Sequence, residues 1–216
     1  MPNNTPRQGA VESESAFDMQ AREAYITGLP PRIKPLQQNE LGKDAIDAVN
    51  NIRKVISLPP TDTVEEYTAT MLRHPALYQR HTELAIQLFS GALSARDREL
   101  AVLRIGWLSK APYEWGEHVK AGKRMAGLTS EEIDRAKQGS TAPGWDEHER
   151  AIIRAVEELI ADAMISDETW AVLSRRLDEK QLIELPLLVG QYQGVAYLQN
   201  ALRLRLMPDN PGLSAR

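Results

Sequence analysis

Apolar residues recur at intervals of three and four positions along most of the chain, which is the spacing of one buried face of an α-helix. Around Ser94–His118 this pattern predicts two helices joined at Pro112. Ser94 and Asp97 give the first a start of the capping-box kind, and the first turn of the second tolerates the proline. No alternating run has the length of an ordinary strand. We therefore expect an all-α bundle with this antiparallel hairpin at its centre.

The same spacing predicts helices on both sides of the hairpin. An amphipathic helix is expected over residues 43–56, and a capping-box signal at Thr63 predicts the next, which ends near Arg73. Pro75 suits the first turn of a helix that reaches about Gly91. Further start signals stand at Thr129, Asp146, Ser166 and Asp178, the last of them opening a long helix to about Met207.

The pattern indicates one core. A chain of 216 residues is long enough for it, and no second core is visible. The polar stretch from Met1 to about Ser15 has almost nothing to bury, so it is expected to be disordered or draped over the rest. We assign residues 1–40 to a flexible or draped arm, residues 41–208 to a single helical domain and residues 209–216 to a tail.

The composition of the chain excludes several classes of partner and of reaction. The chain carries 30 acidic and 26 basic side chains, a net charge of -4, and no dense basic stretch, so we expect no nucleic-acid partner. No apolar run is long enough to cross a bilayer and none resembles a signal peptide, so we expect no membrane partner and a cytoplasmic location. The sequence contains no cysteine, which excludes disulfides and any peroxidase or reductase mechanism that uses a protein thiol.

Two acids and one histidine are the candidate reactive groups of the hairpin. Glu114 and His118 lie four residues apart on one face of the second helix. Antiparallel packing brings Glu99, near the start of the first helix, towards His118. An imidazole held by one carboxylate and near a second is a general acid/base arrangement. We assign proton transfer to His118, orientation of its ring to Glu99, and a second acid/base or substrate-orienting role to Glu114.

Aromatic and polar side chains supply the candidate substrate-binding groups. Trp107, Tyr113 and Trp115 are expected to form apolar walls that exclude water, with the Tyr113 hydroxyl donating to a carbonyl oxygen. Gln191 and Tyr192 interrupt an apolar stretch of the last helix, where they either satisfy backbone groups of a neighbouring helix or line a cavity. Proton transfer next to a carbonyl needs no metal and no cofactor, and we expect neither.

The register of the hairpin resembles that of the carboxymuconolactone decarboxylase family and its alkyl hydroperoxidase D-like relatives. In the peroxidase branch, a glutamate precedes a Cys-x-x-Cys pair and a histidine, with nineteen positions from Glu to His. Glu99 and His118 have the same separation. Ala111 and Glu114 stand at the two cysteine positions, so the chain resembles a branch without the redox pair. The resemblance covers roughly Thr63–Leu206.

This resemblance implies an alkyl hydroperoxidase D-like helical bundle that assembles as a trimer or hexamer of identical chains. It also implies a cofactor-free lyase, isomerase or hydrolase that acts on a small organic carboxylate or lactone, with decarboxylation as one such reaction. Arg96, Arg98 and Arg104 are candidate contacts for a substrate carboxylate, although a surface position is the commoner use of each.

Two other interpretations use the same residues. A Glu and a His four positions apart occur on many solvated helices as a pair worth about 0.3–0.5 kcal/mol. The chain would then be a non-catalytic binding or assembly protein on the same scaffold. Alternatively, Glu99, Glu114, Glu117 and His118 form a candidate site for a divalent ion, although catalytic metal sites usually use more histidine.

The other three histidines are interpreted structurally. His81 lies inside the helix that begins at Pro75, and we interpret it as a core-edge residue satisfied by a backbone carbonyl or water, with a site role as the alternative. His74 precedes a proline and is expected in a loop. His148 is expected in the exposed first turn of the helix that Asp146 begins.

Overall fold

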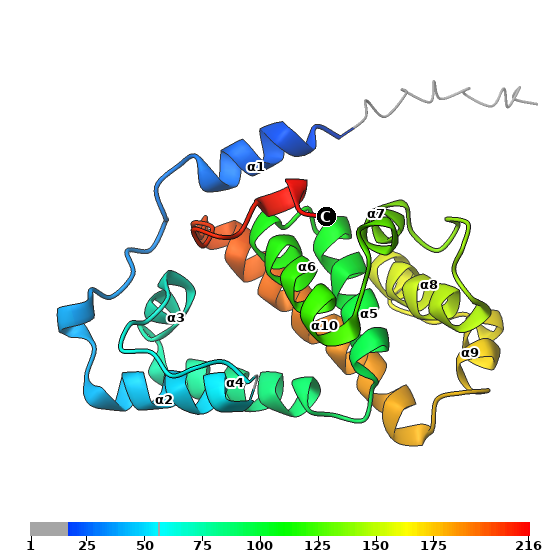
Figure 1. Cartoon of the computed structure of the whole chain (residues 1–216), viewed down its shortest axis with the longest axis horizontal. Coiled ribbons are helices and arrows are strands. Elements are labelled where there is room, and N and C mark those ends of the chain that lie inside the picture. Colours follow the sequence, from blue (N-terminus) through cyan, green and yellow to red (C-terminus); the bar gives the residue numbers. More distant parts are fainter. Residues whose placement is uncertain (1–16, 56) are drawn as a thin grey trace, which may run out of the picture.

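The computed structural model describes residues 17–55 and 57–216, and every regular element within them is helical (Figure 1). This confirms the all-α fold. Within those ranges no helix combines the length and the apolar character needed to cross a membrane. The helices are α1 (Met19–Thr27), α2 (Lys43–Val55), α3 (Glu66–Met71), α4 (Pro75–Phe89), α5 (Ala95–Leu108), α6 (Pro112–Ala126), α7 (Ser130–Gln138), α8 (Glu147–Asp162), α9 (Asp167–Leu173) and α10 (Glu179–Leu202), with the 3₁₀ turns η1 (Gln38–Glu40) and η2 (Gly212–Ser214).

Two sequence-based expectations fall on residues outside the described ranges. One is the disordered or draped stretch from Met1 to Ser15. The other is the inclusion of Ile56 in the helix predicted over residues 43–56. Both stay predictions.

The hairpin of α5 and α6 lies at the centre of the bundle, with α10 alongside it (Figure 1). Its link runs from Ser109 to Ala111, and the Ala111 N–H donates to the Gly106 carbonyl (3.0 Å). Glycine is favoured at this corner because a Cβ on Gly106 would lie 3.3 Å from the Trp115 backbone nitrogen, which is a tight contact. The tight link sets the start of α5 beside the later turns of α6.

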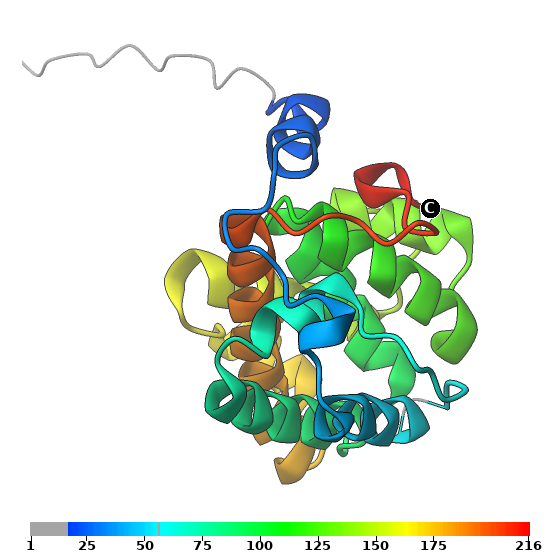
Figure 2. The same cartoon turned by 90° about the vertical axis from the view of Figure 1, so that its left-hand side faces the viewer.

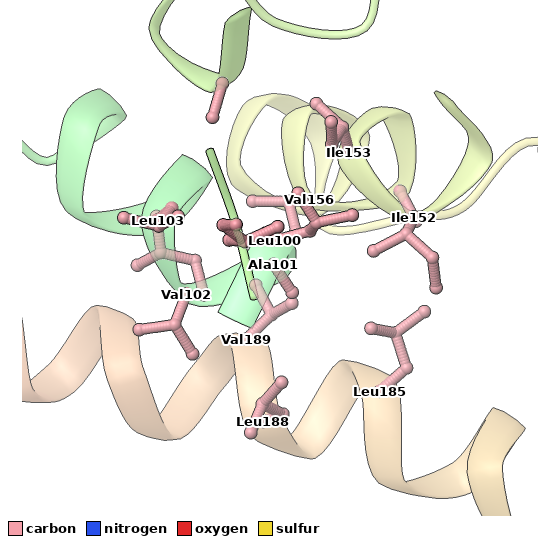
Figure 3. Close-up of a cluster of buried hydrophobic side chains, with 14 of the residues drawn as sticks. Leu100, Ala101, Val102, Leu103, Ile152, Ile153, Val156, Leu185, Leu188 and Val189 are labelled. Atoms are coloured by element: carbon pink, nitrogen blue, oxygen red, sulfur yellow. The ribbon is translucent and has the colours of Figure 1, made fainter. Parts of the chain in front are cut away.

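Helix α5 is surrounded, because α6, α7, α8 and α10 all pack against it. Its residues from Asp97 to Gly106 are all buried. Figure 3 shows Leu100 to Leu103 between side chains of two neighbouring helices. These are Ile152, Ile153 and Val156 of α8, and Leu185, Leu188 and Val189 of α10. The charged residues of α5 must therefore find partners inside the protein, since an isolated buried charge is costly.

A second group of helices, α2, α3 and α4, stands on one side of the hairpin (Figures 1 and 2). It has a small apolar cluster of its own at Val49, Val64 and Ala69. Helix α4 contacts α2, α3 and α10. Side chains of this group and of α6 and α10 line a shared cavity, which is where the candidate site lies.

Capping signals in the sequence locate most of the helices correctly. The side chains of Ser94, Thr129, Asp146, Ser166 and Asp178 each accept a hydrogen bond from the backbone N–H three residues further on. Each satisfies a backbone donor that the first turn of a helix leaves unpaired.

Two predicted boundaries are wrong. Thr63 does not start a helix, because its hydroxyl pairs with the Thr61 hydroxyl (3.0 Å) and α3 begins only at Glu66. The last helix ends earlier than predicted, at Leu202. Arg203 adopts a left-handed backbone conformation there (φ 55°), which ends the helical hydrogen bonding.

Segments near both ends of the chain pack over α6 and α10. The indole N–H of Trp115 donates to the Ala215 carbonyl (3.1 Å). On α1, the Glu23 carboxylate accepts a hydrogen bond from the Leu213 N–H (2.6 Å). The Arg32 N–H donates to the carbonyl of Leu202, the last residue of α10 (2.9 Å).

Candidate active site

Two carboxylates and one imidazole meet across the hairpin. Glu99 lies early in α5, and its Oε2 is 2.8 Å from Nδ1 of His118 on α6. Glu114, one turn before His118, places Oε1 3.3 Å from the other ring nitrogen, Nε2. Both nitrogens of His118 therefore face a carboxylate, which is the convergence expected from the hairpin register. We call these three residues the acid–histidine trio.

Each carboxylate of the trio has a further partner. Arg98 donates from Nε to Glu99 Oε1 (3.2 Å). Gln199 on α10 donates from Nε2 to Glu114 Oε2 (2.7 Å). The remaining oxygen, Glu114 Oε1, is buried without a hydrogen-bond partner among the described residues, and only the ion pair with His118 holds it. It is the atom of the trio best placed to accept a proton.

The two carboxylates control the charge of His118. Burial alone would lower the pKa of His118, but the negative charges of Glu99 and Glu114 outweigh it and raise the pKa to about 10. Burial alone would raise the pKa of Glu99, whereas His118 and Arg98 bring it below its ordinary value. At neutral pH the trio therefore contains an imidazolium, and Glu99 beside it is ionised.

A cavity of about 300 Å³ opens beside the trio. Glu114 and His118 line it, whereas Glu99 is fully buried behind His118. Helices α2, α3, α4, α6 and α10 all contribute to the wall. The polar lining residues are Glu65, Tyr67, Thr68, Tyr78, His81, Thr82, Tyr113, Glu114, Glu117, His118, Gln191, Tyr192 and Gln199.

Three of the predicted substrate-binding residues line this cavity. They are Tyr113, Gln191 and Tyr192. The Tyr192 ring meets the His118 ring edge-on, with centroids 5.1 Å apart. Burial raises the pKa of both tyrosines, and nearby carboxylates add to the effect, so each keeps its phenolic proton at neutral pH. Gln191 and Tyr192 thus line a cavity, which was one of the two alternatives for them.

The two tryptophans are placed elsewhere, which corrects their assignment as cavity walls. Trp115 is fully buried in the main core beneath the C-terminal segment, where its N–H is bound to Ala215. Trp107 packs against its ring, with centroids 5.0 Å apart. Neither residue lines the cavity. Tyrosines and aliphatic side chains of α2 and α4 supply the walls in their place.

Several cavity residues were not among the predicted site residues. Tyr67 on α3, His81 on α4 and Gln199 on α10 all line the cavity. The ring nitrogens of His81 contact the side chains of Tyr67 and Gln191 and not a backbone carbonyl, and the residue lines the cavity, so the favoured core-edge interpretation gives the wrong partners. The one sequence signal for such cavity residues is a polar residue on an otherwise apolar helix, and this signal does not show which side chain the residue contacts.

The arginines do not reach the cavity. Arg96 pairs with Glu132 and Glu149, away from the trio. Arg104 is buried, where it donates to two backbone carbonyls and pairs with Glu157. Only Arg98 touches the trio, through Glu99. None of the three is therefore placed as the candidate contact for a substrate carboxylate, and Arg98 and Arg104 are buried rather than at the surface, which was the commoner use expected of each.

One of the remaining histidines departs from expectation: His148 was expected to be exposed but is 5% exposed, and its Nε2 lies 3.0 Å from Asp97 Oδ1. His74 lies in a bend before α4, as the loop prediction expected, and its ring also accepts a hydrogen bond from the Leu77 N–H (3.3 Å). In the part of the chain that the structure describes, no group of three or more His, Asp or Glu side chains has a geometry that could hold a metal ion.

Comparison with known proteins finds a similarity to one family over part of the chain. Residues 74–158, which include the whole hairpin, match the model of the carboxymuconolactone decarboxylase family. No curated protein matches the chain.

Solved structures share the fold. A peroxidase-related protein from Ralstonia eutropha with an alkylhydroperoxidase AhpD core has a TM-score of 0.70 at 11% identity, covering 84% of this chain and 95% of that one. A peroxidase-related protein from Silicibacter sp. has a TM-score of 0.67 at 14% identity, covering 84% and 95%. The debrominase Bmp8, solved alone and as a cysteine-to-alanine variant with 2,3,4-tribromopyrrole, has a TM-score of 0.62 at 15% identity. The apo form covers 82% of this chain and 93% of that one.

Proposed function

We propose that this chain is a member of the carboxymuconolactone decarboxylase family, in a branch without the cysteine pair, and that it is an acid–base enzyme that transfers a proton at a carbon next to a carbonyl group. The substrate class is a small lactone or related carbonyl compound. The reaction is of the decarboxylase, lyase or lactone-processing type, and it uses the side chains of the protein without a cofactor.

One observation carries the proposal: His118 bridges two buried carboxylates at the edge of a cavity. Two buried acids beside an imidazole are costly to assemble unless they are paired, and removal of any one leaves a buried charge without its partner. Perturbed groups of this kind, gathered in a concave site, are typical of acid–base centres.

The proposed role of each residue of the trio follows from the hydrogen bonds and ion pairs that its atoms make. Glu114 Oε1, without a hydrogen-bond partner in the described residues, accepts the proton from the substrate carbon. The C–H electron pair forms a carbon–carbon double bond, and negative charge moves to the carbonyl oxygen. Protonated His118 returns a proton to the substrate or to an enolate left after loss of carbon dioxide. Glu99 keeps the imidazole oriented and charged.

The charge of the cavity favours an uncharged substrate. Its lining includes the acids Glu65, Glu114 and Glu117, and none of the described lining residues is Lys or Arg. An outer cavity of about 540 Å³ shares His118 and Tyr192 with it and does contain basic residues. Two of these, Arg53 and Lys120, are already paired with carboxylates. A lactone therefore fits the inner cavity better than a free carboxylate.

The burial of the trio disfavours the binding-protein alternative. Solvated side chains that point away from one another would have supported a surface pair of negligible effect. Glu99 and Glu114 are instead 0% and 3% exposed, and both contact His118.

A second copy of the chain is the proposed macromolecular partner, as a trimer or hexamer. The outer face of α10 carries apolar or small residues at alternating intervals of four and three, the spacing of a helix-pairing seam. Ile183, Leu187 and Tyr197 are 65%, 56% and 63% exposed, and Gly190 and Gly194 between them are also exposed. Sedimentation velocity of Leu187→Lys beside the wild type checks this, with dissociation expected.

Solvent deuterium exchange tests the proposed function whichever product the reaction forms. The protein is incubated in D2O with δ-valerolactone and, separately, with the β-keto acid acetoacetate. Proton NMR follows loss of the signal beside the carbonyl, and carbon dioxide release is measured in parallel. We expect His118→Ala and Glu114→Gln to lower the rate by about 10²–10⁴-fold.

His148→Ala is the matched control, because it also removes a buried histidine bound to a carboxylate of α5. Circular dichroism verifies that each variant folds. Folded His118→Ala and Glu114→Gln proteins with the rate of His148→Ala would overturn the proposal.

A further inference from the structure

A chain of hydrogen bonds on three helices faces the same cavity as the trio. The Tyr67 hydroxyl of α3 lies 2.8 Å from Nε2 of His81 on α4. Nδ1 of His81 lies 3.0 Å from the side-chain amide nitrogen of Gln191 on α10. All three residues line the cavity, and none belongs to the trio.

The amide of Gln191 sets the direction of these hydrogen bonds. An amide nitrogen only donates, so Nδ1 of His81 must accept. In a neutral imidazole the other nitrogen then carries the hydrogen, and Nε2–H donates to the Tyr67 oxygen. Consequently the hydroxyl hydrogen of Tyr67 is not used by His81 and is available to a molecule in the cavity.

The protonation states agree with this direction. Burial lowers the pKa of His81, against an opposing effect of the Glu114 charge, so the imidazole is neutral at pH 7. Burial raises the pKa of Tyr67, and Glu114 adds to the effect, so the hydroxyl keeps its proton. These residues thus form a neutral donor, in contrast to the charged trio.

We propose that Tyr67 donates a hydrogen bond to the carbonyl oxygen of the substrate, and that His81 and Gln191 position its hydroxyl. The inference rests on the proposed function. When Glu114 takes the proton from carbon, the C–H electron pair becomes a double bond and the carbonyl electron pair moves to oxygen. Tyr67 stabilises the charge that develops on that oxygen. No oxidant or reductant is involved.

Tyr67 suits this role better than Tyr113, to which the sequence assigned it. The two rings are neighbours, with centroids 6.2 Å apart. The Tyr67 hydroxyl is oriented by its bond to His81, whereas the Tyr113 hydroxyl has no hydrogen bond to any residue that the structure describes. A donor held in place before the reaction stabilises developing charge more effectively than one that must first be ordered.

The first experiment needs no substrate. Nitrogen-15 NMR of the full-length protein reports which ring nitrogen of His81 carries the hydrogen. We expect a neutral ring with the hydrogen on Nε2 at pH 7. In Gln191→Glu, a carboxylate faces Nδ1 and should move the hydrogen there, which makes Nε2 accept from Tyr67. A wild-type ring with the hydrogen on Nδ1 overturns the inference.

The second experiment measures deuterium exchange at the carbon beside the carbonyl of δ-valerolactone. Tyr67→Phe removes only the hydroxyl and should lower kcat by about 10²–10³-fold, the effect of losing one donor to a developing oxyanion. Gln191→Glu should lower kcat while KM stays within about threefold, because the hydroxyl is redirected but the cavity keeps its shape. The control is Tyr25→Phe on α1, which is 51% exposed and does not line the cavity, with no effect expected.

The two proposals fail differently. A Tyr67→Phe rate within threefold of the wild type, with Glu114→Gln inactive, overturns the role of Tyr67 and leaves the proposed function intact. A Glu114→Gln protein with the wild-type rate overturns the proposed function, and the inference falls with it. A wild-type protein that exchanges no proton of the lactone has the same consequence.

Discussion

Helix α5 carries two buried carboxylates, each bound to a histidine of another helix. Glu99 meets His118 of α6 at 2.8 Å, and two residues earlier Asp97 meets His148 of α8 at 3.0 Å. Cavities of similar size, about 300 and 270 Å³, lie beside the two histidines. Pair geometry and cavity size therefore do not distinguish them.

The surroundings of the two acid–histidine pairs do distinguish them. The second oxygen of Asp97 accepts from the Ser94 hydroxyl (2.8 Å), and the cleft beside His148 is lined by capping and ion-paired groups. His118 instead has a second carboxylate, that of Glu114, whose Oε1 has no hydrogen-bond partner among the described residues and whose side chain lines a cavity together with several tyrosines. The Glu99–His118 pair thus differs from the Asp97–His148 pair by a second buried carboxylate beside the cavity. We expect the Asp97–His148 pair to be structural.

The largest difference is expected in activity. His118→Ala should lower proton exchange by about 10²–10⁴-fold, because it removes the acid of the trio. His148→Ala should change the rate by less than about threefold, because it leaves the cavity untouched. Equal losses in the two folded variants would erase the distinction between the pairs.

The next largest difference is expected in stability. Glu99→Ala should lower the free energy of unfolding by about 3–5 kcal/mol, because it removes one partner of a buried charge pair. Glu83→Ala, whose exposed ion pair with Arg80 lies on α4, should cost much less, because solvent screens an exposed pair. Urea denaturation measures both, and a Glu99 variant as stable as the Glu83 variant would contradict the account.

Alkaline pH should weaken the contribution of the Glu99–His118 pair to stability. His118 has its pKa raised to about 10 when folded, whereas the unfolded value is near 6.5. Between these values the unfolded chain has lost a proton that the folded protein keeps. The contribution of His118 to stability, fully present below about pH 6.5, should therefore fall by about 1.4 kcal/mol per pH unit as pH rises towards 10.

The difference in unfolding free energy between the wild type and His118→Gln, measured from pH 6 to pH 10, isolates this contribution. A difference that stays constant would show that the pKa of His118 is not raised.

The smallest effect is expected at the edge of the Asp97–His148 pair. The Ser94 hydroxyl accepts from the Asp97 backbone N–H (3.0 Å) and donates to its carboxylate. Ser94→Ala should lower the free energy of unfolding by about 1 kcal/mol, as the loss of a helix cap usually does. Thermal unfolding measures the loss, and proton exchange should be unchanged. A loss of activity here would implicate the second pair in the reaction.

Much of the fold was predictable because it depends on local patterns. Capping residues such as Thr129 and Asp146 act within one turn, so the sequence locates the helices that they begin. The helix start predicted at Thr63 was wrong because a threonine hydroxyl can also find its hydrogen-bond partner within a turn, and here that partner is Thr61. The convergence of Glu99 on His118 was predictable because a three-residue link leaves two helices little choice but antiparallel packing.

The rest of the site depends on contacts that no local pattern encodes. Gln191 and His81 are separated by 110 positions and meet only because α4 packs on α10. Trp115 was assigned to the cavity because aromatic residues near a site commonly form its walls. Its partner is Ala215, 100 positions away, so the sequence around α6 gives no indication that the ring turns into the core.

The central claim is that two buried carboxylates hold His118 protonated at the edge of the cavity. NMR titration of the histidine ring signals, assigned with His118→Gln, measures this directly. The account predicts that His118 stays protonated until about pH 10. A His118 ring that titrates near pH 6.5, as an unperturbed histidine does, would contradict it.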